Sequence, residues 1–590
     1  MQGLKPIRAE TCGLKPVHTA TRIAAMPQQF RTLVITVAAL VLAGCATTTT
    51  TPPPPLGAGE RVTSPTAQVA ESPRGVVASA TIEATDVGAR VLAQGGNAVD
   101  AAVATAFALA VTEPSMSGLG GRASILLRQP DGTIVGIDGL NQVPSIYQEK
   151  SGIPAPYERA AIPGVPAALA QVLATHGTWS LARVLQPAVD LAAHGFILGE
   201  AEAARWAAAR EELSTFGAGR GTYLREDGSL WKAGERVANP LLAATMRRLA
   251  TDGVDAFYRG VIAEAIDADM RANKGFLLRD ELAGYRAIPA LVVRGTYRGH
   301  AVASNFRPAA GHAVIQALNT LEHLPVPARG DDARWAAVIG QAMHWALTDR
   351  ATRRGTEAES ADFLTSSTHA KDRAGRVMIP VATAVDARTV EPYQGAGLLF
   401  PPGTLVTAPS DREATTHLSV ADREGRVVAL TQSLGPSMGT RLVAPGLGFL
   451  FATRLGTVPG SRPASTVAPT IVVRPDNQGV VALGGAGDSR IISAVIQVVS
   501  RLVDHKMTLA ESVLAPRVHP DAERTLRVEE GPVSSWSAAD RQLLSTWGFT
   551  LVPSPSGFFG RVHAVQRGGP GTAALAVAEP RWTGGAAGAK

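Results

Sequence analysis

Ala414-Thr415-Thr416-His417-Leu418-Ser419-Val420 is the stretch that decides how this chain is built. A small residue precedes two threonines, and the residues that follow predict a strand over 418–421. A turn over 422–425 and a second apolar run over 427–430 complete a predicted hairpin. The threonine pair therefore stands at the start of a strand that enters the core of a folded domain.

The peptide bond before Thr415 is a candidate site of self-cleavage. Breaking it would leave Thr415 as a new N-terminus, with a hydroxyl and a free α-amine on one residue. Because an α-amine titrates near pH ~8, it can accept the proton of its own hydroxyl near neutral pH and activate it as a nucleophile. This is the chemistry of an N-terminal nucleophile hydrolase. Threonine pairs also precede strands in ordinary sheets, so the motif alone leaves a purely structural role open.

Composition excludes several classes of protein. The 590 residues carry 56 basic and 50 acidic side chains, a net charge of +6, and 45% of them are hydrophobic, enough for a large core. Basic clusters such as Arg247-Arg248 and Arg353-Arg354 are short and lack interleaved aromatics, which argues against nucleic-acid binding. The body after Cys45 has no cysteine, and the twelve histidines show no metal-binding spacing. We expect neither a metal nor another cofactor.

The N-terminal segment is typical of an export signal. Arg31 precedes an apolar run over 33–41 that is too short to span a bilayer comfortably. The run ends in Leu42-Ala43-Gly44-Cys45, which resembles a bacterial lipobox. We therefore expect a lipid on Cys45, which would anchor the protein to a membrane of the bacterial cell envelope on its periplasmic or cell-surface side. An ordinary secretory signal and a short anchor helix are the alternatives.

The chain divides into four regions. Residues 1–45 form an N-terminal extension and signal peptide, in which Met26 is the expected start because the residues before it lack helical periodicity. Residues 46–72 form a Thr/Pro-rich tether that is biased to polyproline II and cannot bury a core. Cleavage before Thr415 would divide the rest into a large subunit, 73–414, and a small subunit, 415–590, intertwined in one catalytic domain.

The body alternates helices and strands. Periodicity predicts helices over 85–92, 98–111, 241–249, 334–348 and 491–503, and strands over 123–128, 291–295, 301–304, 470–473 and 480–483. Asp488-Ser489 is predicted to cap the last of these helices. Helices combined with antiparallel strand pairs predict a layered α/β sandwich.

Short motifs follow one another in a fixed order between about residues 73 and 570. They are Gly95-Gly96-Asn97-Ala98-Val99-Asp100-Ala101-Ala102, Pro163-Gly164-Val165-Pro166, Pro187-Ala188, Ala193-His194-Gly195-Phe196, Asp255-Ala256-Phe257-Tyr258-Arg259-Gly260, Asp280-Glu281-Leu282-Ala283-Gly284-Tyr285, Tyr297-Arg298-Gly299, Thr415-Thr416-His417, Arg462-Pro463-Ala464-Ser465-Thr466, Ala468-Pro469-Thr470-Ile471-Val472 and Gly487-Asp488-Ser489-Arg490-Ile491-Ile492. Together they resemble the gamma-glutamyltranspeptidase (glutathione hydrolase) family. The resemblance implies an α+β fold, the four-layer αββα sandwich of the N-terminal nucleophile hydrolases, made as one precursor whose two subunits stay packed together.

The resemblance also implies catalytic roles. Thr415 would attack the carbonyl before it, cut the chain through an N-to-O acyl shift, and then act as the catalytic nucleophile. A second hydroxyl eighteen positions later, here Ser433, would hydrogen-bond the nucleophile. The backbone amides at Gly487 and Asp488 would form the oxyanion hole, although Asp488 replaces a glycine and brings a carboxylate near the developing negative charge.

One departure from the family affects the subsite for the α-carboxylate of a γ-glutamyl group. Leu140 replaces the arginine that would bind this carboxylate. Loss of such a bidentate contact is worth on the order of 2–5 kcal/mol in a buried site. The hydroxyl pair that assists the arginine is retained as Ser465 and Thr466.

The subsite for the α-ammonium group changes as well. Gly435 replaces an asparagine, and Arg454 and Thr457 fall where the family has glutamine and aspartate. A cation at this place would repel a γ-glutamyl group. The glycine-rich loop over 117–121 also loses its last glycines, and Arg122 stands in place of one of them. Arg122 and Arg454 either bind an acidic group in a new position or simply face solvent.

Two functions follow. The first is a self-cleaved amidohydrolase or acyltransferase that acts on a small amide or peptide through an acyl-enzyme on Thr415, with altered recognition of the acyl group. The second is a non-catalytic envelope lipoprotein that retains the fold. The joint retention of Thr415, Ser433 and the Ser465-Thr466 pair favours the enzyme.

Overall fold

The computed structural model describes residues 68–149, 151–381, 414–569, 571–581 and 584–590. The predicted signal, Cys45 and most of the tether lie outside these residues. The tether's last residues are not a tether, because Val69–Ser72 forms strand β1 and pairs antiparallel with β18 (Ala574–Val577). The folded body thus begins earlier than the predicted boundary at residue 73, since a strand near the C-terminus supplies the pairing partner.

Two antiparallel sheets form the centre of this part of the chain. The first sheet contains, in spatial order, β19 (Gly585–Gly588), β2 (Gly75–Ser79), β10 (Ala414–Asp422), β11 (Val427–Gly435), β3 (Arg122–Arg128), β4 (Ile134–Gly139) and β7 (Ile288–Pro289). The second contains β1, β18, β17 (Arg561–Arg567), β13 (Val480–Ala486), β12 (Thr470–Val473), β9 (His300–Asn305) and β8 (Val292–Tyr297).

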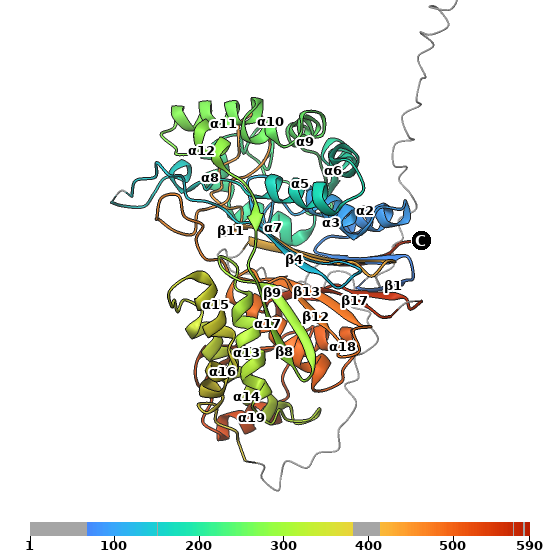
Figure 1. Cartoon of the computed structure of the whole chain (residues 1–590). Helices are drawn as coiled ribbons and strands as arrows, with labels where there is room; N and C mark the ends of the chain where they lie inside the picture. The colour runs from blue at the N-terminus through green and yellow to red at the C-terminus, as the bar shows by residue number, and fades with distance from the viewer. Residues whose placement is uncertain (1–67, 150, 382–413, 570, 582–583) are drawn as a thin grey trace, which may run out of the picture. The chain divides into compact units, whose positions relative to one another are not determined.

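Helices pack on the outer face of each sheet (Figure 1). Those on the first sheet include α2 (Ile82–Ala93), α3 (Ala98–Thr112), α5 (Val165–His176), α6 (Leu181–His194), α9 (Pro240–Asp252), α10 (Asp255–Tyr258) and α11 (Val261–Ala272). Those on the second include α13 (Gly311–Glu322), α14 (Asp332–Asp349), α15 (Glu357–Thr365), α17 (Ser489–Val503), α18 (Leu509–Leu514) and α19 (Ala538–Thr546).

The remaining elements are short. They are α4 (Pro156–Arg159), α7 (Glu200–Ala208), α8 (Arg210–Thr215), α12 (Arg279–Gly284), α16 (Ser367–Ala374), a sheet of β14 (Val518–Ala522), β15 (Thr525–Glu529) and β16 (Thr550–Ser554), and the pair β5 (Phe196–Ile197) and β6 (Arg236–Val237). None of the helices among the described residues has both the length and the apolar character needed to cross a bilayer.

Three hydrophobic clusters confirm the predicted αββα sandwich. The first lies between the outer helices and the first sheet, and the second between α13, α14, α17 and the second sheet. The third lies between the sheets, where Leu126 and Ala421 of the first share a core with Ile471 and Ala482 of the second. The order is therefore helix, sheet, sheet, helix.

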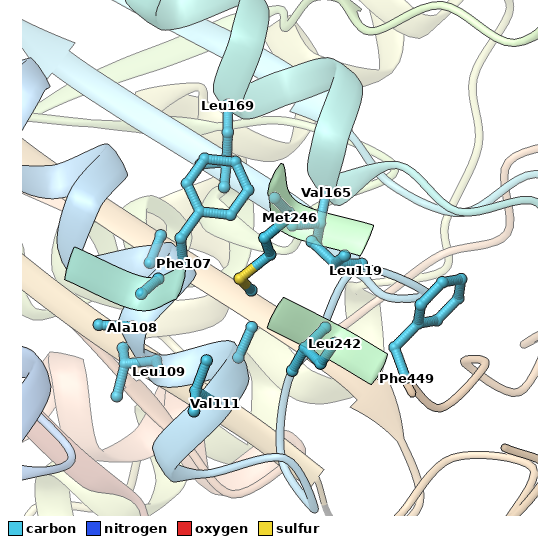
Figure 2. Close-up of a cluster of buried hydrophobic side chains, with 14 of the residues drawn as sticks. Phe107, Ala108, Leu109, Val111, Leu119, Val165, Leu169, Leu242, Met246 and Phe449 are labelled. Atoms are coloured by element: carbon cyan, nitrogen blue, oxygen red, sulfur yellow. The ribbon is translucent and has the colours of Figure 1, made fainter. Parts of the chain in front are cut away.

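The first cluster shows why the alanine-rich segment over 98–112 is a buried helix. Phe107 and Leu109 of α3 pack with Leu169 of α5 and with Met246 of α9 (Figure 2). Small residues on the other faces of α3 allow close approach of its neighbours, and every residue of this helix is buried.

The start of α3 explains the motif at residues 95–102. The Asn97 side chain accepts hydrogen bonds from the amides of Val99 and Asp100, and Asp100 accepts one from the Asn97 amide at 2.8 Å. This capping box satisfies amides that the helix itself cannot. Asp422, at the end of β10, accepts a hydrogen bond from the Ala98 amide at 3.0 Å. The motif thus fixes the helix start against the β10 hairpin.

Candidate active site

Strand β10 carries Thr415 on the face that looks toward the second sheet. Leu418 and Val420 pack in the helix-facing cluster, whereas Ala421 packs in the cluster between the sheets. Because side chains alternate along a strand, Thr415 and His417 share the face of Ala421. The nucleophile candidate therefore points into the space between the two sheets.

Three strands place three polar side chains in one row on this face. Thr415 of β10 pairs with Ser433 of β11, and Ser433 pairs with Arg122 of β3. Residues directly opposite one another in an antiparallel sheet present their side chains to the same face. The row runs from hydroxyl to hydroxyl to guanidinium.

The hydroxyls of Thr415 and Ser433, which we call the hydroxyl pair, meet at the carbonyl of Ala414. Thr415 Oγ1 lies 2.8 Å from the Ala414 carbonyl oxygen and 3.1 Å from Ser433 Oγ. Ser433 Oγ donates to the same carbonyl and accepts a hydrogen bond from the Gly435 amide at 3.0 Å. Both side chains are buried, and the strand register shifts between Ala414 and Thr415. Two hydroxyl groups thus converge on one peptide carbonyl.

His417 occupies the next row and braces the strand. Its Nδ1 lies 2.8 Å from Thr431 Oγ1, and its Nε2 lies 3.0 Å from Ser419 Oγ. Burial lowers the pKa of His417 well below its usual value, and the nearby His563 lowers it further. A neutral ring with both nitrogens engaged holds the strand in place.

Gly487 and Asp488 follow β13 and precede α17. A Cβ on Gly484 of this strand would lie 2.4 Å from the His417 ring, so β13 passes directly over β10. In the described part of the chain, neither the Gly487 nor the Asp488 amide donates a hydrogen bond to another residue. Two amides at the start of a fifteen-residue helix are suited to bind a negative charge.

Asp488 does not cap α17 as predicted. Its backbone has φ 50° and ψ −130°, a region that favours glycine, and its side chain accepts no hydrogen bond from the helix. The carboxylate instead accepts a hydrogen bond from Thr466 Oγ1 at 3.0 Å, and it is exposed. This contact ties the loop that carries Ser465 and Thr466 to the start of the helix.

Leu140 lies in a small apolar cluster with Ala309 and Val467. The leucine is buried, and the hydroxyl of Tyr285 donates to its carbonyl at 2.7 Å. Val467 directly follows Ser465 and Thr466 in the chain, so this apolar cluster borders the retained hydroxyls. Where the family resemblance implies an arginine, the surroundings are suited to a hydrocarbon group.

Arg454 is held by neighbouring groups. Its guanidinium lies 3.9 Å from the centre of the Tyr147 ring and donates to the Tyr147 hydroxyl and, at 2.9 Å, to the Gly456 carbonyl. It is partly exposed, and Thr457 is exposed. The structure therefore does not bring Arg454 into the row of the hydroxyl pair.

Arg122 is buried, so the second of the two alternatives for this residue, that it faces solvent, is wrong. Only 2% of the residue is exposed, because β3 begins at Arg122 and turns its side chain between the sheets. Its Nη2 donates to the Thr453 carbonyl at 3.2 Å, and its Nε has no hydrogen-bond partner among the described residues. Burial lowers the pKa of Arg122 to about 9, although Asp488 acts to raise it.

Sequence reasoning missed a buried charge cluster near the glycine-rich loop. Glu202 accepts hydrogen bonds from the Ser115 amide at 2.8 Å and from the Ser115 hydroxyl at 2.6 Å, and it pairs with Arg205 at 2.8 Å. Burial raises the pKa of the neighbouring Glu113. The Ser115 carbonyl in turn accepts the amide of Met438. The cluster thereby fixes the segment that leads into Arg122. The only feature of the sequence that could have indicated this cluster is an acidic residue, Glu113, directly after an apolar helix.

Other features of the described residues lie apart from this site. A cavity of about 540 Å³ beside α5 and α10 is lined by residues such as Trp179, Tyr258 and Tyr285, and it includes none of the predicted site residues. Within the described ranges, no three or more histidine, cysteine, aspartate or glutamate side chains gather as a metal site requires.

The sequence profile of the gamma-glutamyltranspeptidase family matches residues 84–589. The chain belongs to this family. Among its relatives, the glutathione hydrolase proenzyme of Escherichia coli (strain K12) is 32% identical over 511 residues, covering 78% of this chain and 83% of that protein. The acylase ACY 1 proenzyme of Pseudomonas sp. (strain V22) is 29% identical over 519 residues, covering 82% and 88%.

A solved structure extends the likeness to three dimensions. The crystal structure of cephalosporin acylase from Bacillus halodurans superposes with a TM-score of 0.75 and 25% identity, covering 88% of this chain and 96% of that one. The proteins to which this chain is similar are thus named both for hydrolysis of glutathione and as acylases, and the two sequence relatives above are named as proenzymes.

Proposed function

We propose that this protein is a self-cleaved amidohydrolase or acyltransferase with Thr415 as its nucleophile. The observation that carries the proposal is the position of Thr415 Oγ1 beside the Ala414 carbonyl, with the Ser433 hydroxyl donating to that carbonyl oxygen. The membership of the gamma-glutamyltranspeptidase family and the proenzyme names of its relatives support it.

Self-cleavage would proceed as an acyl shift. Thr415 Oγ attacks the Ala414 carbonyl carbon, a C–O bond forms, and Ser433 stabilises the negative charge on the carbonyl oxygen. The C–N bond then breaks, and the nitrogen of Thr415 receives the hydroxyl proton. Water hydrolyses the resulting ester, which leaves a carboxylate on Ala414 and a free amine and hydroxyl on Thr415.

Turnover would reuse the same atoms. The free amine accepts the proton of Thr415 Oγ, which attacks the amide carbonyl of a substrate, and the leaving amine takes the proton. The unpaired amides of Gly487 and Asp488 would bind the oxyanion. Water or a second amine then releases the acyl group from Thr415. Leu140, Gly435 and Arg454 support altered recognition of the acyl group, and no cofactor takes part.

A denaturing gel of the full chain with intact mass measurement tests this proposal. The wild type should separate into two subunits, the smaller of which begins at Thr415 and ends at residue 590. Thr415→Ala should remain a single chain, whereas Thr415→Ser, which keeps a hydroxyl, should still be cut, more slowly. An uncut wild type would contradict the proposal and favour the non-catalytic lipoprotein, for which the carboxylate of Asp488 beside the oxyanion site is the supporting observation.

We further propose that the protein is exported and lipid-anchored through Cys45, which places it in the bacterial cell envelope. The support is the Leu42-Ala43-Gly44-Cys45 sequence after a short apolar run. Incorporation of a radiolabelled fatty acid in bacterial cells tests it, with Cys45→Ser as the control. Label on the wild type that is lost in Cys45→Ser is the expected result, and an unlabelled wild type would contradict the anchor.

A further inference from the structure

The candidate active site takes its groups from both sheets. Thr415 and Ser433 lie on β10 and β11 of the first sheet, whereas Gly487 and Asp488 follow β13 of the second. Donors stabilise an oxyanion only at about 3 Å from the oxygen, so turnover depends on how the two sheets are held against each other. Self-cleavage depends on this less, because the hydroxyl pair and the Ala414 carbonyl all belong to the first sheet.

The first sheet has an uncovered edge beside Thr415. Strand β2 pairs with β10 only over residues 419–422 of β10, so no described strand covers the earlier residues on that side. Thr416 lies on this stretch and is buried. Its side chain faces α3, because Leu418 and Val420 share its face and pack in the helix-facing cluster. Groups other than a strand of this sheet therefore bury the edge.

Two buried charged groups lie beside Thr416. Glu113 directly follows α3, Arg561 begins β17, and each is only 3% exposed. Burial raises the pKa of Glu113, whereas Arg205, Arg561 and the Thr416 hydroxyl act to lower it. Burial lowers the pKa of Arg561 to about 10, although Glu113 acts to raise it. The carboxylate and the guanidinium are thus close enough to attract each other.

The crossing of two strands brings Arg561 to the first sheet. Val565 of β17 packs in the cluster between the sheets, and Arg561 shares its face because side chains alternate along a strand. The Ser419 hydroxyl of β10 donates to the His563 carbonyl of β17 at 3.0 Å, which fixes the point where the strands cross. Thr416 and Arg561 both lie within three residues of this point. The uncovered edge of β10 leaves the guanidinium a way past the sheet.

Arg561 also lies beside the amides of the candidate oxyanion hole. It pairs with Ala486 in the ladder of β17 and β13, and Ala486 directly precedes Gly487. A Cβ on Gly487 would lie 3.1 Å from the Cα of Gly560, so the two segments are in close backbone contact. The contacts therefore run from β10 through Glu113 and Arg561 to the start of α17.

We infer that Glu113 is a positioning residue that, through Arg561, holds the strand of Thr415 at a fixed distance from the Gly487 and Asp488 amides. This inference rests on the proposed function and adds to it a residue that touches no substrate. Removing one partner of a buried charged pair leaves the other without its compensating charge, so the surroundings must shift. A shift between the sheets would separate the nucleophile from the oxyanion donors and leave the hydroxyl pair intact.

Two rates measured on one variant test the inference. The first is self-cleavage, followed as the loss of full-length chain on a denaturing gel. The second is acylation of Thr415 by p-nitrophenyl acetate, in which Oγ bonds to the acetyl carbon, the free amine takes the hydroxyl proton, and p-nitrophenolate leaves. Glu113→Gln should lower the limiting acylation rate by about 10- to 100-fold, as a small displacement of reacting groups does. Its KM and its self-cleavage rate should stay close to those of the wild type.

A double-mutant cycle shows whether Glu113 acts through Arg561. Arg561→Gln should slow acylation as Glu113→Gln does, and the double variant should be little slower than either single variant, because all three remove the same link. Two independent structural effects would instead multiply. Arg561→Lys keeps the charge and should restore part of the rate.

Arg567→Gln is the matched control for the arginine variants. Arg567 is buried on the same strand and face as Arg561, six residues away, and it donates to the Arg423 carbonyl at 3.1 Å. This variant also removes a buried guanidinium from between the sheets, but far from Gly487 in the ladder. It should keep the wild-type acylation rate.

The outcomes separate this inference from the proposed function. A wild type that is uncut, or that releases p-nitrophenol no faster than Thr415→Ala, contradicts the proposed function and the inference with it. If the wild type is cut and acylated, an unchanged acylation rate in Glu113→Gln, or equal losses in its two rates, overturns the inference alone. Multiplying effects in the cycle overturn it as well. If Glu113→Gln does not fold, Arg561→Gln decides, and a wild-type acylation rate there overturns the inference.

Discussion

The hydroxyl pair and the residues that surround it differ in how the fold holds them. Thr415 and Ser433 lie on the neighbouring strands β10 and β11 of the first sheet and pair with each other, and Ser433 also pairs with Arg122 of β3. We call the second set the candidate acyl-recognition residues; they lie at strand ends and in loops and comprise Arg122, Leu140 and Gly435. The first set agrees with the family pattern and the second departs from it.

The difference teaches where this fold permits change. Residues within a paired strand take their position from the register of the sheet, which is strongly specified where one face is buried. Residues at strand ends and in loops can be replaced with little effect on the core, and binding specificity resides there. On the proposed function, the candidate nucleophile Thr415 is retained while the residues expected to recognise the acyl group differ from the family pattern.

Removing the Ser433 hydroxyl tests the role of the hydroxyl pair and should have the largest effect. Ser433→Ala deletes the donor to the Ala414 carbonyl, so self-cleavage should slow by about 100- to 1,000-fold, the usual effect of losing one oxyanion donor. The rate is measured by the loss of full-length chain on a denaturing gel. Ser433→Thr keeps the hydroxyl and should be cut at a rate close to that of the wild type. Equal rates for Ser433→Ala and the wild type would remove Ser433 from the mechanism.

Low pH should destabilise the fold around the hydroxyl pair, because a buried histidine then takes up a proton. Burial lowers the pKa of His563 on β17 to about 4, below the ~6.5 expected when unfolded. The unfolded state then binds the proton more readily, so the stabilisation is complete above pH ~6.5 and is lost as the pH falls toward 4. Replacing this histidine should remove up to ~3 kcal/mol of pH-dependent stability over that window.

Urea unfolding of His563→Asn and of the wild type between pH 4 and 7.5 measures this effect. The asparagine keeps an acceptor for the Glu579 amide, which lies 3.4 Å from His563 Nδ1. The difference in unfolding free energy between the two proteins should change with pH in the stated direction. A difference that is constant across the range would show that His563 does not titrate in this way.

A methyl group added at residue 435 tests the residues that depart from the family pattern. Gly435 has φ 96°, and a Cβ there would meet the Arg122 guanidinium. Gly435→Ala should displace this guanidinium and disturb the Gly435 amide that donates to Ser433 Oγ, so self-cleavage should slow by about tenfold, as for loss of one hydrogen bond. The loss of full-length chain on a denaturing gel provides the test. Gly425→Ala, also at positive φ but in the exposed β10 hairpin turn, controls for backbone strain.

Substitutions of Asp488 should have the smallest effects on stability and turnover. Its backbone conformation favours glycine, so Asp488→Gly should relieve strain of about 1–2 kcal/mol, less the lost bond from Thr466. Removing the carboxylate should also speed turnover a few-fold if the Gly487 and Asp488 amides bind the oxyanion. Asp488→Asn separates the two effects, because it removes the charge and leaves the strain. A slower Asp488→Asn would assign the carboxylate a positive role in catalysis.

Local patterns predicted much of the fold. The strand over 470–473 has the bounds predicted for it, and α3, α9, α14 and α17 lie where apolar periodicity placed them. The strands β10 and β11 run further than predicted, to Ala414 and Gly435. The polar ends of these strands were not predicted as strand. The hydroxyls of Thr415 and Ser433 bond to each other across the sheet, and no local pattern of residues predicts such pairing.

Long-range strand pairing also explains which residues of the candidate site could be predicted from the sequence and which could not. The family resemblance in the sequence pointed to Thr415 and Ser433, and the structure brings their hydroxyls to 3.1 Å of each other on adjacent strands of one hairpin; their catalytic roles stay a prediction. It left Arg122 open between binding and exposure, because β3 is far from β10 and β11 in the chain. Only the pairing of these strands placed the buried guanidinium in the row of Thr415 and Ser433. Register between distant strands is a property of the whole packed sheet, and the tertiary structure alone decides it.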